Sequence, residues 1–189
     1  MVVNIKSEED LINFYRKLKK LKNNKLKINI NCDIREKDKY ELKQIEKVTC
    51  IKDKYQQLSV LFDELCDYLD KYIVGNICEF DDNGLCIAQR NGNQKIKING
   101  CCGKCIYVGN KGCTIRNITC KTFFCRYIKS IKEIPDYKES KLYKYFLTRS
   151  QKILLETSFF IPKDELIKRM YNVNMIKLLF IKDVPMKRY

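Results

Sequence analysis

Eight of the eleven cysteines lie within residues 78–125, and this density is the clearest chemical signal in the sequence. Thiolates are the ligands that structural zinc sites and iron–sulfur clusters prefer. The chain starts without the apolar core of a signal peptide, and a reducing cytosol keeps such thiols from forming disulfides. The pattern therefore predicts metal ligation, and the candidate ligands are Cys78, Cys86, Cys101, Cys102, Cys105, Cys113, Cys120 and Cys125.

Histidine is absent from the chain, and this restricts the kind of site. Zinc fingers with mixed Cys/His ligands, histidine general bases and the two-His-one-carboxylate iron site are all excluded. A soft-metal site must then consist of thiolates. Four thiolates suit zinc and an iron–sulfur cluster equally, and eight candidates allow one site or two.

The spacing of the cysteines predicts how they could converge. Cys78 and Cys86 are separated by seven residues, as are Cys105 and Cys113, and each gap has Asn and Gly near its end. Such gaps favour short β-hairpins that bring two sulfurs to one side. Between them, Cys102-Gly-Lys-Cys105 has the C-x2-C step by which one turn supplies two ligands to a tetrahedral site.

Residues 100–127 resemble a known family. Cys105-Ile-Tyr-Val, then Gly112-Cys113-Thr-Ile and Cys120-Lys-Thr-Phe-Phe-Cys125, are similar to the YkgJ-like cysteine-cluster family of zinc- or iron-chelating proteins. That family usually opens with C-x3-C-x2-C-C, whereas here the paired cysteines come first. The resemblance implies ligand roles for Cys105, Cys113 and Cys120. A flagellin lysine methylase shares this type of cluster. By analogy alone, the resemblance therefore implies a protein-modification enzyme as an alternative function.

Positive charge is concentrated in the C-terminal half. Residues 101–189 contain 19 basic and 7 acidic side chains, against 19 and 16 in residues 1–100. Residues 101–132 contain seven basic side chains and no acid, which we interpret first as compensation for a negative thiolate site together with a general bias of the sequence toward lysine. The alternative is contact of this basic half with an acidic protein or with nucleic acid.

The cysteine cluster leaves several functions open. The leading prediction is a metal-binding protein with zinc or an iron–sulfur cluster, and the alternatives are an iron–sulfur-dependent protein-modification or redox enzyme and a zinc-stabilised nucleic-acid-binding protein. The radical-SAM and bacterial ferredoxin cysteine runs, a Walker A loop and a dinucleotide-binding glycine motif are all missing. A dithiol redox pair at Cys102 and Cys105 is disfavoured because six further thiols lie nearby.

The flanking sequence predicts helices. Ser7 and three following acids resemble a capped helix start, with the helix running to about Leu21. Residues 26–30 alternate like a short strand, and residues 38–72 predict one long helix or two with a break near residues 49–53. Cys66 falls on the apolar stripe of that region and is predicted to be core. A further helical region is expected over residues 138–156, with one apolar face made by Leu142, Tyr143, Phe146, Leu147, Ile153 and Leu154. A last helix is expected over residues 163–170, opened by Pro162, and a terminal strand at 176–181.

These predictions combine into a mainly α protein with a small, irregular, loop-rich cysteine module containing short β-hairpins. We expect an N-terminal helical region at 1–74, the cysteine-cluster module at 75–130, and a C-terminal basic helical region at 131–189 that packs with the N-terminal region. No apolar run approaches the roughly 20 residues that a bilayer span needs, so the sequence predicts a soluble, cytoplasmic protein without a membrane partner.

Overall fold

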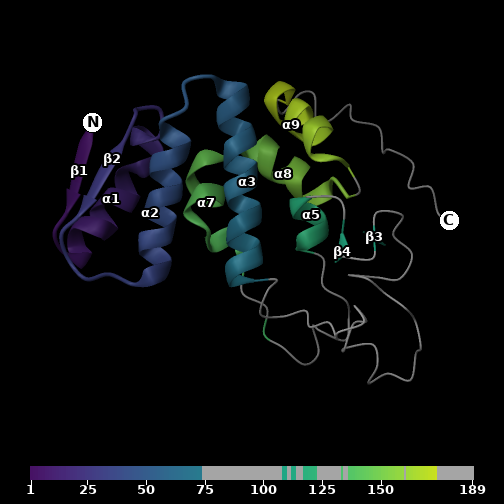
Figure 1. The fold of residues 1–189 in the computed structure, drawn as a ribbon. Coiled ribbons are helices and arrows are strands. Elements are labelled where there is room, and N and C mark those ends of the chain that lie inside the picture. Colours follow the sequence, from purple (N-terminus) through teal and green to yellow (C-terminus); the bar gives the residue numbers. More distant parts are fainter. Residues whose placement is uncertain are drawn as a thin grey trace. The chain divides into compact units, whose positions relative to one another are not determined.

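The structure is a computed structural model that describes residues 1–73, 117–122, 133, 136–159 and 161–173, together with the backbone of residues 108–109 and 112–113. These residues are mainly helical, with one small parallel sheet and one short antiparallel strand pair, as Figure 1 shows. The chain divides into two compact units, Met1–Leu65 with Lys138–Thr148, and Cys66–Tyr137 with Arg149–Tyr189. None of the described helices is both long and apolar enough to span a bilayer.

The first unit begins with a β-α-β element. Strand β1 (Val2–Ile5) pairs in parallel with β2 (Lys27–Ile30), and helix α1 (Glu8–Leu21) connects them. The Ser7 hydroxyl accepts the Asp10 N–H at 3.2 Å, and the Asp10 carboxylate accepts the Lys6 N–H at 3.0 Å. The first bond satisfies one of the N-terminal N–H donors of α1 and the second holds the residue before its cap, so the predicted helix start is confirmed. Strand β1 was not expected from the sequence.

Residues 36–72 form two helices, α2 (Glu36–Thr49) and α3 (Lys54–Tyr72), which is the second of the two alternatives. Asp53 starts α3, because its carboxylate accepts the Gln56 N–H at 2.8 Å. The Gln57 side-chain amide donates to the carbonyl oxygens of Val48 and Ile51, at 3.0 and 3.3 Å. Local hydrogen bonds therefore stabilise the break, because they satisfy carbonyl groups at and after the end of α2 and an N–H group at the start of α3.

Helix α7 (Lys141–Phe146) completes the first unit by packing against α1 and α2. The core consists of large apolar side chains from α1, α2, α7 and the start of α3, including Phe14, Leu18, Leu42, Ile45, Phe62 and Leu142. All are at most 4 % exposed. The start of the predicted C-terminal helical region thus packs against N-terminal helices.

A buried polar cluster joins α1, α2 and α7 inside this unit. The Asp38 carboxylate accepts the Tyr15 hydroxyl at 3.4 Å and pairs with Arg35 at 2.7 Å. Glu41 accepts the Lys141 N–H at 2.8 Å, and the Lys141 ammonium lies 4.8 Å from the centre of the Tyr15 ring. Burial raises the pKa of Glu41 and, with the nearby Asp38 carboxylate, that of Tyr15.

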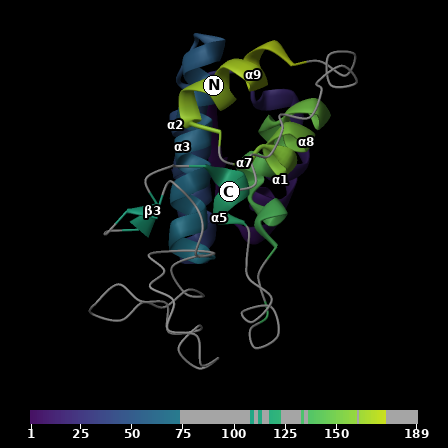
Figure 2. The same ribbon diagram turned by 90° about the vertical axis from the view of Figure 1, so that its right-hand side faces the viewer.

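The second unit contains the end of α3, the short helix α5 (Ile118–Lys121), α8 (Arg149–Thr157) and α9 (Lys163–Asn172). Helix α8 contacts both α5 and α9, and Figure 2 shows these helices from a second side. The core of the second unit includes Tyr68, Leu69, Leu155, Leu166 and Met170. The predicted last helix is confirmed, starting after Pro162.

Two details differ from the expectation for residues 138–156. The chain forms a 3-10 helix, η2 (Tyr137–Glu139), then α7, and then α8 after an extended residue at Leu147. This interruption changes the helical phase, so Ile153, expected on the buried face, is 37 % exposed. The prediction for Ile153 was wrong, whereas Leu142, Tyr143, Phe146, Leu147 and Leu154 are buried as expected.

Candidate metal centre

Cys120 is the candidate ligand whose side chain the structure describes, and it lies on α5. A four-residue helix is not stable by itself, because nucleation is unfavourable and few hydrogen bonds follow it. The position of α5 must therefore come from contacts outside the helix. Three neighbours of Cys120 in sequence supply them.

Asn117 provides the largest share of these contacts. Its side chain is fully buried, and its amide oxygen accepts the Cys120 N–H at 3.2 Å, capping α5. Its amide nitrogen donates to the carbonyl oxygens of Ser158 and Ile161, at 3.0 and 2.7 Å. One side chain thus caps the helix that carries Cys120 and ties it to the connection between α8 and α9.

Two further residues hold α5 in place. The Thr119 hydroxyl is buried and donates to the carbonyl oxygen of Leu155 in α8. The Lys121 ammonium pairs with the Asp70 carboxylate near the end of α3. We call Asn117, Thr119 and Lys121 the α5 anchor. It fixes the backbone at Cys120, whose side chain is itself only partly buried, and a fixed backbone lowers the entropy lost when a thiolate binds a metal.

A short antiparallel strand pair includes a second candidate ligand, Cys113. Strands β3 (Val108–Gly109) and β4 (Gly112–Cys113) are antiparallel, with Val108 opposite Cys113 and Gly109 opposite Gly112. A hairpin was predicted between Cys105 and Cys113, and an antiparallel strand pair of residues 108–109 and 112–113 lies within that range. Cys113 therefore occupies a paired strand position. The convergence of the two sulfurs stays a prediction.

The other candidate ligands, Cys78, Cys86, Cys101, Cys102, Cys105 and Cys125, lie outside the described residues, as does the predicted strand at 176–181. The predicted convergence of four sulfurs and the proposed boundaries at residues 74 and 130 stay predictions.

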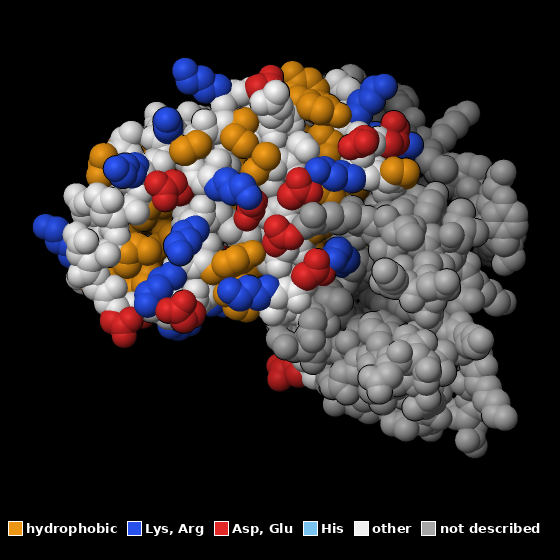
Figure 3. Space-filling view, in the orientation of Figure 1, with side chains coloured by type: hydrophobic (Ala, Val, Ile, Leu, Met, Phe, Trp, Pro, Cys, Tyr) orange, Lys and Arg blue, Asp and Glu red, His pale blue; other side chains and the backbone are white. Residues whose placement is uncertain are grey.

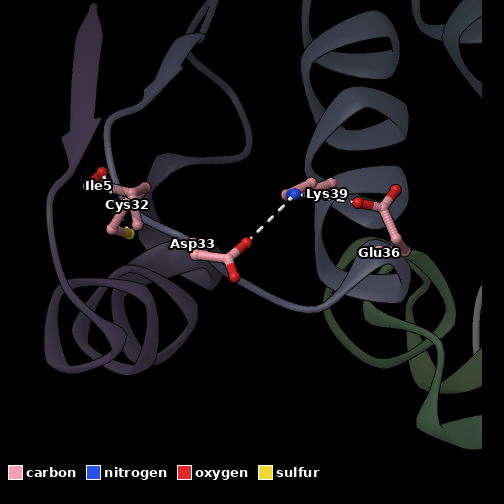
Figure 4. Close-up of polar contacts among 5 residues, drawn as sticks. All are labelled: Ile5, Cys32, Asp33, Glu36 and Lys39. Atoms are coloured by element: carbon pink, nitrogen blue, oxygen red, sulfur yellow. Dashed lines mark hydrogen bonds and ion pairs between the residues drawn. The ribbon is translucent and has the colours of Figure 1, made fainter.

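Two cysteines outside the predicted module, Cys66 and Cys32, contribute to packing and hydrogen bonding within the fold. Cys66 is fully buried in α3, as predicted for a core residue. The Cys32 thiol donates to the Ile5 carbonyl oxygen at 3.6 Å, and nearby Asp33 and Glu36 both bind Lys39, at 3.4 and 2.9 Å (Figure 4). In the part of the chain that the structure describes, no three Cys, Asp or Glu side chains gather in a way that could hold a metal ion.

We did not predict the α5 anchor from the sequence, although the residue type of Asn117 indicates a helix cap. Asparagine is among the preferred N-cap residues, and Asn117 stands directly before the α5 segment. Comparison of the chain with protein-family models, with curated proteins and with solved structures gives no match.

Proposed function

We propose that this chain is a cytosolic metal-binding protein whose residues 78–125 hold zinc or an iron–sulfur cluster through cysteine thiolates. The observation that carries the proposal is the presence of eight cysteines within this segment of a chain that has no histidine. A divergent relationship to the YkgJ-like family is part of the same proposal and rests on the motifs at residues 100–127.

The surroundings of Cys120 support a ligand role. The α5 anchor fixes the peptide at Cys120 through hydrogen bonds within the second unit. The side chain is only partly buried, so its sulfur is not sealed inside the core as that of Cys66 is. A metal site gains affinity when its ligands are held before the metal arrives.

The composition of the segment supports a folding role for the metal. Residues 76–125 contain six of the seven glycines, and glycine loses more conformational freedom on folding than any other residue. Sulfur–metal bonds supply the free energy that small glycine-rich modules do not obtain from apolar burial.

The test is metal analysis of the full chain purified without oxygen. We expect a stoichiometric metal, with an absorption spectrum that separates colourless zinc from a brown iron–sulfur cluster. Cys120→Ser should lower the metal content or affinity. Cys50→Ser is the matched control, because Cys50 is an exposed free thiol outside the segment, and it should leave the metal unchanged. Protein that stays metal-free after anaerobic reconstitution with zinc, or with iron and sulfide, would overturn the proposal.

A further inference from the structure

A basic surface lies on the first unit, at the C-terminal half of α1 and the connection to β2. Residues 16–27 contain seven Lys or Arg side chains and no Asp or Glu. Six of the seven are exposed, namely Arg16, Lys17, Lys19, Lys20, Lys25 and Lys27. We call these six residues the basic surface.

The charge of this surface is not neutralised within the described residues. None of its six side chains forms a salt bridge there, and the one polar contact is from Arg16 to the Asn13 amide oxygen at 3.5 Å. Elsewhere in the same unit, Arg35, Lys39 and Lys47 each pair with an acid. On the face drawn in Figure 3, Lys and Arg side chains are interspersed with Asp and Glu.

Helix stability explains only part of this arrangement. Lys19 and Lys20 lie in the last turn of α1, where cations interact favourably with the helix dipole. Arg16 lies earlier in the helix and stands four residues from Lys20, a like-charge spacing that destabilises a helix. Lys25 and Lys27 lie beyond the helix altogether. A surface that stabilises the fold so little is better explained by a polyanionic partner.

A second segment extends the surface in space. The Lys54 ammonium lies 3.4 Å from the Asn23 amide oxygen, so the start of α3 is beside the connection between α1 and β2. Lys52 and Lys54 are exposed. Asp53 is the acid of this loop, and its carboxylate already accepts the Gln56 N–H.

The side chains of α1 indicate the kind of polyanion. The aromatic residues of α1, Phe14 and Tyr15, are buried, so they cannot stack on the bases of a single strand. Ile12 is the exposed large apolar side chain of α1, and Met1 and Val2 are exposed beside Lys25 and Lys27, which together are fewer than the apolar face of a membrane-surface helix. Protein interfaces are typically depleted of lysine. Lysines on a helix whose own aromatic side chains are buried suit phosphate groups approached from outside a duplex.

We infer that the basic surface binds the phosphate backbone of a double-stranded nucleic acid without reading its sequence. This binding is independent of the proposed metal site, because every residue that carries it lies in the first unit.

The test is fluorescence anisotropy of a labelled DNA duplex of about 20 base pairs, titrated with the full chain. If about four of the cations contact phosphates, the association constant should fall about 150-fold between about 50 and about 200 mM salt. The triple variant Lys17→Gln, Lys20→Gln, Lys25→Gln should lose at least about tenfold in affinity at the lower salt and most of the salt dependence. Glutamine has nearly the helix propensity of lysine, so α1 is preserved.

The matched control is Lys6→Gln, Lys43→Gln, Lys168→Gln, which removes the same net charge from exposed lysines that form no salt bridge among the described residues. It should bind the duplex nearly as the wild type does. Equal losses in the two variants, or a flat salt response of the wild type, would overturn the inference. So would binding to phosphatidylserine vesicles in preference to the duplex, since that outcome assigns the surface to membranes.

Discussion

Replacing Asn117 by alanine tests the link between the fold and the candidate metal centre. The buried side chain makes three hydrogen bonds, to Ser158, Ile161 and Cys120. At about 1 kcal/mol net for each, their loss should lower the free energy of unfolding by about 3 kcal/mol. If Cys120 is a ligand, the variant should also bind metal about tenfold to a hundredfold more weakly, as expected when residues that orient a ligand are removed.

Urea denaturation measures the first quantity, and competition with a chromophoric chelator measures the second. Asn172→Ala is the matched control, because Asn172 is exposed and its amide makes one bond to the Lys168 carbonyl oxygen at 3.0 Å. It should change stability by about 0.5 kcal/mol or less. Wild-type stability in Asn117→Ala would refute the account of the α5 anchor. Lower stability with unchanged metal affinity would show instead that Cys120 is not a ligand.

Three further predictions concern the first unit. Burial raises the pKa of Glu41, so its stabilising contribution is complete below the unfolded value of 4.5 and is lost as pH rises through the folded pKa. Glu41→Gln should remove that decline, measured as unfolding free energies between about pH 4.5 and 8. Ser7→Ala should cost about 1 kcal/mol by removing the cap of α1, and an unchanged urea midpoint would contradict this. Phe62→Ala should cost about 3 to 5 kcal/mol, against well under about 1 kcal/mol for the exposed Tyr55→Ala, compared by thermal denaturation.

The parts of the fold that the sequence predicted depend on local interactions. The start of α1 was readable because Ser7 and Asp10 are three residues apart and bond to each other. The break before α3 was left open, because the sequence does not show that the Gln57 amide joins two helix ends. Strand β1 was missed because a four-residue strand is recognised by its partner, which stands 25 residues later.

In the candidate site, too, local features were predicted from the sequence and long-range contacts were not. Density and spacing predicted which cysteines could bind metal, and the strand pair of residues 108–109 and 112–113 lies where the Asn and Gly between Cys105 and Cys113 predicted a hairpin. Asn117 was recognisable as a helix cap, but its tie to the connection between α8 and α9 was not predictable, because its amide nitrogen bonds to carbonyl groups 41 and 44 residues away. The exposure of Ile153 was mispredicted because two residues, Leu147 and Thr148, separate two helices that the apolar pattern joins.

The first unit is assembled from two stretches of chain that flank the cysteine-rich segment. The Lys141 N–H donates to the carboxylate of Glu41, which lies 100 residues earlier in the chain. Residues 66–137, which form the loop between the two stretches, belong to the other unit. Closing so long a loop loses entropy, and the pairing of Lys121 with Asp70 inside the second unit shortens the effective loop to about a third, reducing that loss by about 1 kcal/mol. Folding of the second unit would thus favour docking of α7, and a docked α7 would stabilise the second unit by the same free energy.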